Sequence, residues 1–108
     1  MMKWMTRIPT HDNDGNSLEG LVLQTLLHEV RNRFDGYSFD GPGWGAWTDD
    51  DGMVYEENSY VLTVLCERTR YLDARNLVIE IGKGLGQKAM YFEVRDVDGV
   101  EIITIEED

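Results

Sequence analysis

The sequence predicts one α+β domain over residues 1–108, a ferredoxin-like βαββαβ sandwich with an added C-terminal strand. Its antiparallel sheet would carry two helices on one face, because both crossovers are right-handed. The segment 60–66 (Tyr-Val-Leu-Thr-Val-Leu-Cys) is apolar on both strand faces, which is typical of the centre of a sheet. Two other segments repeat apolar residues at helical spacing, and strand-like segments precede, separate and follow them.

The first strand is expected over residues 3–10, with Pro9 at its end because proline cannot donate to a ladder. A polar turn follows, and the first helix is expected to begin at Asn16, which with Glu19 forms a variant capping box. Gly36 would end this helix in a left-handed cap. The expected buried positions of strand and helix are Trp4, Thr6, Ile8, Leu23, Leu26, Leu27, Val30 and Phe34.

The next strand, 37–48, is interrupted by Gly41-Pro-Gly-Trp-Gly45, whose glycines and proline predict a loop or wide bulge. The turn 49–52 ends in Asp-Gly and predicts a hairpin. The partner strand would begin near Met53 and run into the central strand. The polar stretch 56–59 predicts a bend or bulge, or a place where the strand emerges into solvent.

Thr69 or Asp73 is the expected cap of the second helix. A strand over 88–96 follows it, and Asp98-Gly99 would turn the chain into a last strand over 100–106. The tail, residues 106–108, is expected to be frayed. The expected buried face of the second helix is Ala74, Leu77, Val78, Ile81 and Leu85.

Charge and cysteine content narrow the classes of function. The formal net charge is −11, from 21 acidic and 10 basic side chains, which disfavours direct binding to nucleic acid and docking on anionic lipid. Cys66 is the single cysteine, so no intrachain disulfide can form and a structural zinc site lacks its ligands. No signal peptide or membrane span is expected, which makes a cytoplasmic location the default. No cofactor or metal is predicted.

The second face of the sheet predicts self-association. Val61, Thr63, Leu65 and Tyr91 are candidates for this open face, although the sequence does not fix which parity faces the helices. A small α+β sheet with an apolar open face is often closed by a second copy. We therefore expect a homodimer.

The most unusual segment is Gly41-Pro-Gly-Trp-Gly-Ala-Trp47, because two tryptophans among glycines can form an aromatic wall with close backbone access. The alternative is that one tryptophan simply covers the end of the sheet. With Arg7 nearby across the strands, a small pocket is expected there. The predicted ligand-binding residues are Trp44, Trp47, Tyr55, Glu57 and Tyr91.

His11 lies beside Asp12 and Asp14, and a neighbouring carboxylate would raise its basicity and hold its tautomer. His11 could then act as a general acid/base with Arg7 holding an anion, or form half of a metal site. The alternative is a turn that leads into a helix. The turn fails as a calcium loop, because no register supplies both the glycine and the final glutamate.

Arg7-Ile-Pro-Thr-His-Asp-Asn-Asp-Gly15, the helix ending Arg33-Phe-Asp-Gly36, Gly45-Ala-Trp47 and Gly86-Gln-Lys-Ala-Met-Tyr91 resemble a family of small uncharacterised bacterial proteins. The resemblance implies a ferredoxin-like α+β fold. It implies no activity and no catalytic residues.

Three functions follow as hypotheses. The first is a non-enzymatic binding module, acting as a homodimer, whose ligand or protein partner meets the open face and the tryptophan loop. The second is an acidic inhibitor that imitates nucleic acid and blocks a basic DNA- or RNA-binding protein. The third is a small dimeric α+β barrel enzyme that uses His11 as its base.

Overall fold

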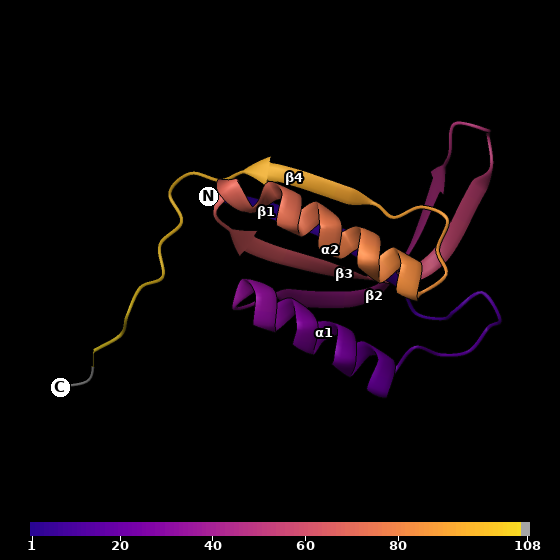
Figure 1. Cartoon of the computed structure of the whole chain (residues 1–108), viewed down its shortest axis with the longest axis horizontal. Helices are drawn as coiled ribbons and strands as arrows, with labels where there is room; N and C mark the ends of the chain where they lie inside the picture. Colours follow the sequence, from indigo (N-terminus) through magenta and orange to yellow (C-terminus); the bar gives the residue numbers. More distant parts are fainter. Residues whose placement is uncertain (107–108) are drawn as a thin grey trace.

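The computed structural model describes residues 1–106 and shows two helices on one face of a four-stranded antiparallel sheet (Figure 1). The strand order β2-β3-β1-β4 is that of a ferredoxin-like βαββαβ domain, so the predicted fold class is confirmed. The elements are β1 (Met2–Pro9), α1 (Leu21–Phe34), β2 (Ser38–Thr48), β3 (Val54–Cys66), the short 3₁₀ helix η1 (Arg68–Arg70), α2 (Tyr71–Gly84) and β4 (Phe92–Asp96).

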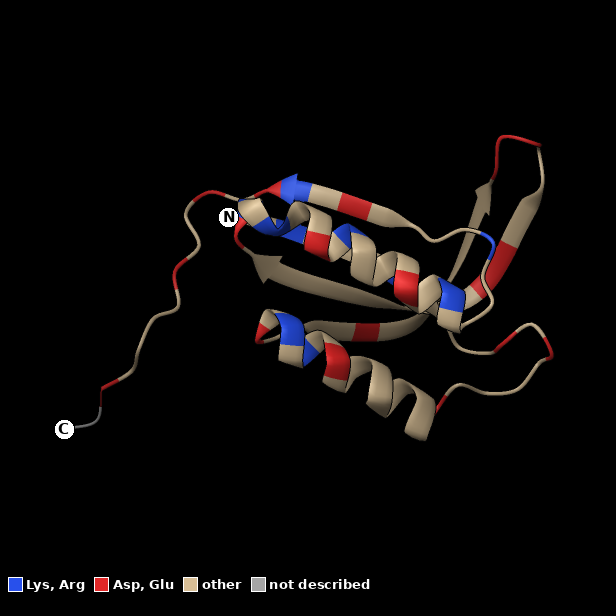
Figure 2. Cartoon of the chain, in the orientation of Figure 1, with Lys and Arg blue, Asp and Glu red and all other residues tan. Residues whose placement is uncertain are grey.

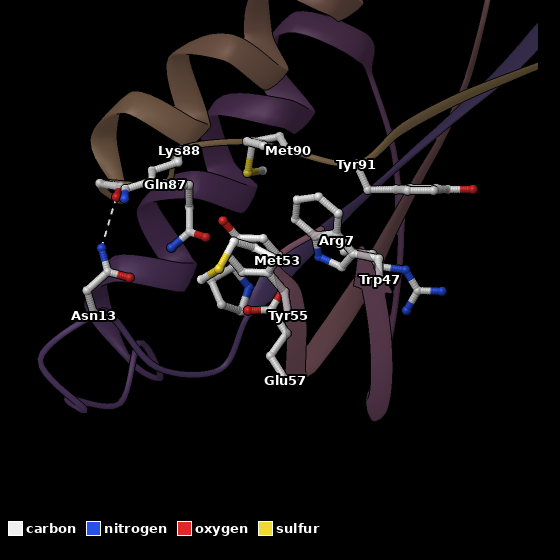
Figure 3. A pocket seen from close by; sticks show the side chains of 13 residues that line it. Arg7, Asn13, Trp47, Met53, Tyr55, Glu57, Gln87, Lys88, Met90 and Tyr91 are labelled. Atoms are coloured by element: carbon white, nitrogen blue, oxygen red, sulfur yellow. Dashed lines mark hydrogen bonds between the residues drawn. The ribbon is translucent and has the colours of Figure 1, made fainter. Parts of the chain in front are cut away.

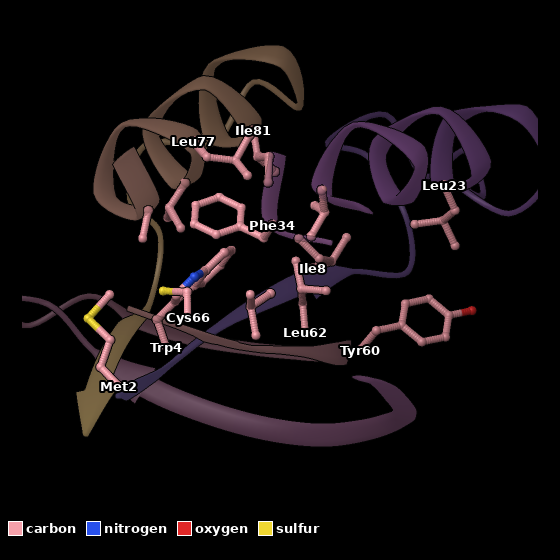
Figure 4. Packing of buried hydrophobic residues seen from close by; sticks show 14 of the residues in the cluster. Met2, Trp4, Ile8, Leu23, Phe34, Tyr60, Leu62, Cys66, Leu77 and Ile81 are labelled. Carbon is pink, nitrogen blue, oxygen red and sulfur yellow. The ribbon is translucent and has the colours of Figure 1, made fainter. Parts of the chain in front are cut away.

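The core lies between the sheet and the two helices (Figure 4). Trp4 is fully buried at its centre, with Phe34 of α1 at a ring-centroid distance of 5.4 Å and Phe92 of β4 at 6.2 Å. Alternate residues of β1 and β3 point toward the helices, as the strand period requires. The buried apolar residues include Met2, Ile8, Leu62, Val64, Cys66, Leu23, Val30, Ala74, Leu77, Val78 and Ile81.

The segment 60–66 occupies the central position that its sequence predicts, because β3 pairs with β1 on one side and β2 on the other. Tyr60, Leu62, Val64 and Cys66 are buried toward the helices. Val61, Thr63 and Leu65 are half-buried on the opposite face, which settles the parity that the sequence left open.

Both expected helix caps are wrong. α1 begins at Leu21, after Gly20 with a φ of 89°, and no side chain caps it. Asn16 instead donates its backbone N–H to Asp12, and Glu19 accepts a hydrogen bond from the Tyr60 hydroxyl. The left-handed residue at the end of α1 is Asp35 rather than glycine.

At α2 the chain first forms η1, and the helix starts at Tyr71 without a side-chain cap. Thr69 lies inside η1. Asp73 lies within the first turn of α2, where its carboxylate pairs with Arg70 at 3.3 Å. Asp73 therefore forms an ion pair and does not cap the helix.

The β2–β3 hairpin is longer and more regular than predicted. A register shift between Asp40 and Gly43 confirms the expected bulge. The stretch 56–59 forms no bend, because its backbone stays in register with β2. β4 begins at Phe92 rather than at residue 88, since regular pairing with β1 starts opposite Thr6.

The predicted strand over 100–106 is not formed: within residues 1–106 the sheet has four strands. The Val97 amide donates to the Met1 carbonyl at 3.1 Å, which takes the chain past the end of β1 instead of back along β4. Residues 100–106 then run away from the body of the domain (Figure 1). The predicted frayed end at 107–108 lies outside the described residues. None of the helices within residues 1–106 combines the length and apolar character that a membrane crossing requires.

Candidate functional site

A cavity opens beyond the end of β1. β1 stops at Pro9, opposite Ser59, whereas β3 continues for five more residues to Val54. On the other side of β1, segment 86–91 approaches β4 without forming a strand. The space that a longer β1 would fill is a cavity of about 300 Å³ between segment 86–91 and the far part of the hairpin (Figure 3).

One wall of the cavity is aromatic. Trp47 of β2 and Tyr55 of β3 are direct cross-strand partners, and their rings stack with centroids 4.5 Å apart and planes inclined by 15°. The Tyr55 hydroxyl donates to Asp49 Oδ2 at 3.2 Å, which raises the pKa of Tyr55. Both aromatic side chains are half-buried, so the pair presents a planar surface at the cavity.

Trp44 does not join this wall. It lies three residues before Trp47 on the same strand, so the two side chains point to opposite faces. Trp44 is 69% exposed and lines a neighbouring recess with His11. The expected wall of two tryptophans is therefore wrong, and Tyr55 takes the second place in it.

Arg7 and Glu57 supply opposite charges to the cavity. The Arg7 guanidinium lies 5.7 Å from the centroid of the Tyr91 ring, in a cation–π contact. Partial burial raises the pKa of Glu57, and the positive charge of Arg7 opposes that rise. The cavity thus contains the five N–H donors of the Arg7 guanidinium and the partly buried carboxylate of Glu57.

Segment 86–91 forms the opposite wall and is fastened at three points. The Asn13 amide donates from Nδ2 to the Gly86 carbonyl at 2.9 Å, as Figure 3 shows. The Thr6 hydroxyl donates to the Tyr91 carbonyl at 2.6 Å. Met90 packs so closely on α2 that a Cβ at Gly82 would lie 2.7 Å from its Cγ.

Of this wall, Tyr91 is the one residue among the predicted ligand-binding residues. The sequence predicts a strand from residue 88 and a turn at Asn13 with no distant partner. Gln87, Lys88, Ala89 and Met90 also line the cavity. The absence of a side chain at Gly82 was the available signal, since a helical glycine often marks a close approach.

His11 and Asp12 line a neighbouring recess, which shares Asn13, Glu57 and Gln87 with the cavity. His11 Nδ1 lies 2.8 Å from the Thr10 hydroxyl oxygen, and the side chain is exposed. Asp12 is occupied by its own loop, because it accepts hydrogen bonds from the backbone amides of Asp14 and Asn16 and from the Asn16 side chain. These bonds, chiefly that from the Asn16 backbone, lower the pKa of Asp12.

Of the residues expected to act together with His11, the structure therefore places Arg7 in the neighbouring cavity and ties Asp12 to the loop backbone. Asp14 is exposed. Among residues 1–106, no three His, Cys, Asp or Glu side chains are grouped so that they could hold a metal ion.

Comparisons with known proteins identify the fold. No protein-family model matches the chain, and no curated protein matches its sequence. Similar solved structures include a phage SAM lyase in complex with S-methyl-5′-thioadenosine, with a TM-score of 0.63 and 15% identity over 88% of this chain and 80% of the other. The PII-like protein CutA from Nostoc sp. has a TM-score of 0.63 and 15% identity, covering 91% of this chain and 82% of its own.

The divalent cation tolerance protein Cut A1 from Thermus thermophilus has a TM-score of 0.64 and 10% identity, covering 94% of this chain and 88% of its own. At these identities the likeness concerns the path of the backbone. The chain is therefore similar in fold to CutA-type PII-like proteins and to a phage SAM lyase.

Proposed function

We propose that this chain is a binding module for a small ligand with a planar aromatic group, held in the cavity beside Trp47 and Tyr55. The observation that carries the proposal is the stacked pair of these rings next to Arg7 and Glu57. Aromatic surfaces with a few convergent polar groups are typical of small-molecule sites.

The chemistry of the cavity favours a ligand that is flat and bears both donors and acceptors. Arg7 can donate to an oxygen or a ring nitrogen, and Glu57 can accept from a hydroxyl or an amine. The edge of β3 at 54–57, which has no β1 partner, adds backbone donors and acceptors. We propose that the module binds this ligand without converting it.

The phage SAM lyase offers a starting ligand for the test. Its bound S-methyl-5′-thioadenosine joins a flat purine to a ribose and a thioether, and these groups match a stacking surface beside donors and acceptors. The first panel is S-methyl-5′-thioadenosine, adenosine and AMP, with free ribose and methionine as ligands that lack an aromatic ring.

The test is isothermal titration calorimetry with the wild-type chain and two alanine variants. We expect saturable binding of at least one purine ligand, its loss in Trp47→Ala and its retention in Trp44→Ala. Absence of saturable binding across the purines, or equal binding by both variants, would refute the assignment. Chromatography of the ligand after prolonged incubation checks the mechanism, because consumption of the ligand would favour the enzyme hypothesis.

We also propose that the module acts as a homodimer through the open face of its sheet. Met5, Val61 and Leu65 are half-buried there. Lys3 pairs in register with Arg95, and Met5 with Glu93, so charges of both signs flank the apolar strip. A two-fold contact can place such charges opposite one another. Leu65→Lys should raise the concentration at which the assembly dissociates, measured by light scattering over a dilution series, and an unchanged dissociation curve would exclude this face.

A further inference from the structure

The C-terminal arm, residues 97–106, carries an apolar strand-like sequence that makes no strand in its own chain. Its residues 100–105 read Val-Glu-Ile-Ile-Thr-Ile, in which β-branched side chains dominate. Ile102 is 86% exposed, Ile103 69% and Ile105 81%. Three exposed isoleucines in four positions are unusual on a monomer surface and mark a segment that binds something.

The far part of the β2–β3 hairpin, in contrast, is a strand pair that lacks a further neighbouring strand. Beyond the end of β1, residues 43–48 and 54–58 form a ribbon of two strands only. Such a ribbon is marginally stable in water without a third strand. The outer edge of 43–48 reads Gly-Trp-Gly-Ala-Trp-Thr and has none of the charged side chains that protect natural edges from pairing.

The arm cannot reach this edge in its own chain. It leaves the sheet beside Met2, which pairs with Cys66, whereas Gly43 pairs with Ser59. Seven residues of strand separate these two levels, which is about 23 Å. Residues 97–99, which would have to cross that distance, span at most about 11 Å when fully extended. In Figure 1 the arm and the hairpin tip lie at opposite ends of the molecule.

We propose that residues 100–105 add as a strand to the outer edge of β2, at residues 43–48, in a second copy of the chain. The contact is heterologous, since an arm meets an edge, and it closes by reciprocal exchange between two copies or around a ring. It gives the ribbon its third strand and covers part of the exposed surface of the three isoleucines. The contact lies on a different surface from the open face and needs no ligand in the cavity.

The test measures mass and local protection on full-length chains. Multi-angle light scattering should give at least twice the chain mass of 12.4 kDa for the wild type. In the Leu65→Lys background, which removes the open-face contact, Ile102→Ser/Ile103→Ser/Ile105→Ser should give the single chain mass with an unchanged circular dichroism spectrum. The matched control, Glu101→Gln, alters an exposed polar residue of the same arm and should keep the wild-type mass.

Amide hydrogen exchange locates the contact. The outward-pointing amides of residues 43–48 should exchange at least tenfold faster in the triple serine variant than in the wild type or in the control. A monomeric wild type, a Leu65→Lys chain whose mass the three serines do not lower, or unchanged exchange at 43–48 would each overturn the proposal. Leu65→Lys separates the two self-association surfaces, because it should leave protection at 43–48 in place.

Discussion

Trp47 and Tyr55 stack face to face across the β2–β3 hairpin, with ring centroids 4.5 Å apart, where the hairpin extends beyond the end of β1. In residues 59–66 of β3, by contrast, each position lies next to β1 as a further strand. The stack itself stands at the border of a cavity. The pair therefore both stabilises the ribbon and forms the planar wall on which the proposed ligand would lie.

The first prediction separates these two contributions. Trp47→Ala should lower the free energy of unfolding by about 1 kcal/mol, the value of a cross-strand aromatic pair, and should abolish purine binding. Tyr55→Phe keeps the stack and removes only the hydroxyl donor to Asp49, so binding should persist. Trp44→Ala should change stability by less than about 0.5 kcal/mol because this side chain is mostly exposed. Urea denaturation measures the three changes.

The second prediction concerns the titration of Glu57. Burial raises its pKa and Arg7 holds that rise in check, so Arg7→Gln should raise the pKa of Glu57 further. Carbon-13 NMR of the side-chain carboxyl follows the titration. Arg31→Gln, at an exposed position on α1, is the matched control and should leave it unchanged. A lowered or constant Glu57 pKa in Arg7→Gln would contradict the electrostatic coupling.

The same shift has a consequence for stability. An acid whose folded-state pKa lies above its unfolded value favours the folded state most below the unfolded pKa, and this advantage is lost as the pH rises through the folded pKa. In the interval between these two pKa values, the stability of the wild type should fall as the pH rises. Glu57→Gln cannot ionise at this position, so its stability should not show this fall. Thermal melts of both chains across the interval provide the comparison.

The third prediction tests the packing of segment 86–91 on α2. A methyl group at Gly82 would meet Met90 Cγ at 2.7 Å, so Gly82→Ala should destabilise the fold by about 1 to 3 kcal/mol. Gly84→Ala, two residues along the same helix, meets no atom within 4 Å. It should be neutral or stabilise by up to about 1 kcal/mol because alanine is the better helix former.

A double variant identifies the source of the Gly82→Ala effect. Met90→Ala alone costs stability through lost packing. Gly82→Ala should cost less in the Met90→Ala background than in the wild type, because the side chain it collides with is gone. Equal costs in both backgrounds would mean that the collision is not what destabilises the helix.

The fourth prediction concerns the acidic turn. Asp12 has a lowered pKa because backbone amides donate to its carboxylate. Its contribution to stability is therefore present above the unfolded aspartate pKa and is lost as the pH falls through the folded pKa. Asp12→Asn should reduce stability at neutral pH and flatten the acid limb of the stability curve. Asp14→Asn, at an exposed position in the same turn, should leave that limb as in the wild type.

The sequence predicted the sheet because the alternation of apolar and polar side chains along a strand reflects which of its faces is buried. The double apolarity of 60–66 and the alternation of Trp4, Thr6 and Ile8 both correspond to positions in the structure. The helix caps could not be read in the same way. Asn16 and Glu19 have the right chemistry for a cap, but Asn16 bonds to Asp12 within the same turn, and Glu19 bonds to Tyr60, which only the tertiary structure brings near.

The cavity was predictable in part. Arg7, Trp47, Tyr55, Glu57 and Tyr91 were grouped because neighbouring strands place them at one end of the sheet, and the structure does bring them together. Trp44 was included from its nearness in sequence, which ignores the alternation of side chains along a strand. The opposite wall depends on where β1 ends, which Pro9 indicates, and on how Met90 packs against α2, for which Gly82 is a weak signal.

The net charge of −11 remains the basis for the hypothesis of a basic protein partner. Figure 2 shows acidic residues at the hairpin tip, in the turn before α1 and along the arm, while basic residues gather on the helices and β4. Asp49 at the hairpin tip is already engaged, since it accepts hydrogen bonds from the amides of Asp51 and Met53. A basic partner would meet separate acidic ends rather than one continuous acidic face.

The end of β1 at Pro9 means that a backbone length, rather than a particular set of side chains, fixes the volume of the cavity. Two more residues of strand would occupy the space with main chain, whereas a strand shorter by two would lose Ile8, which is fully buried in the core. Relatives of this protein could therefore accept smaller ligands by insertion at a single position in the chain.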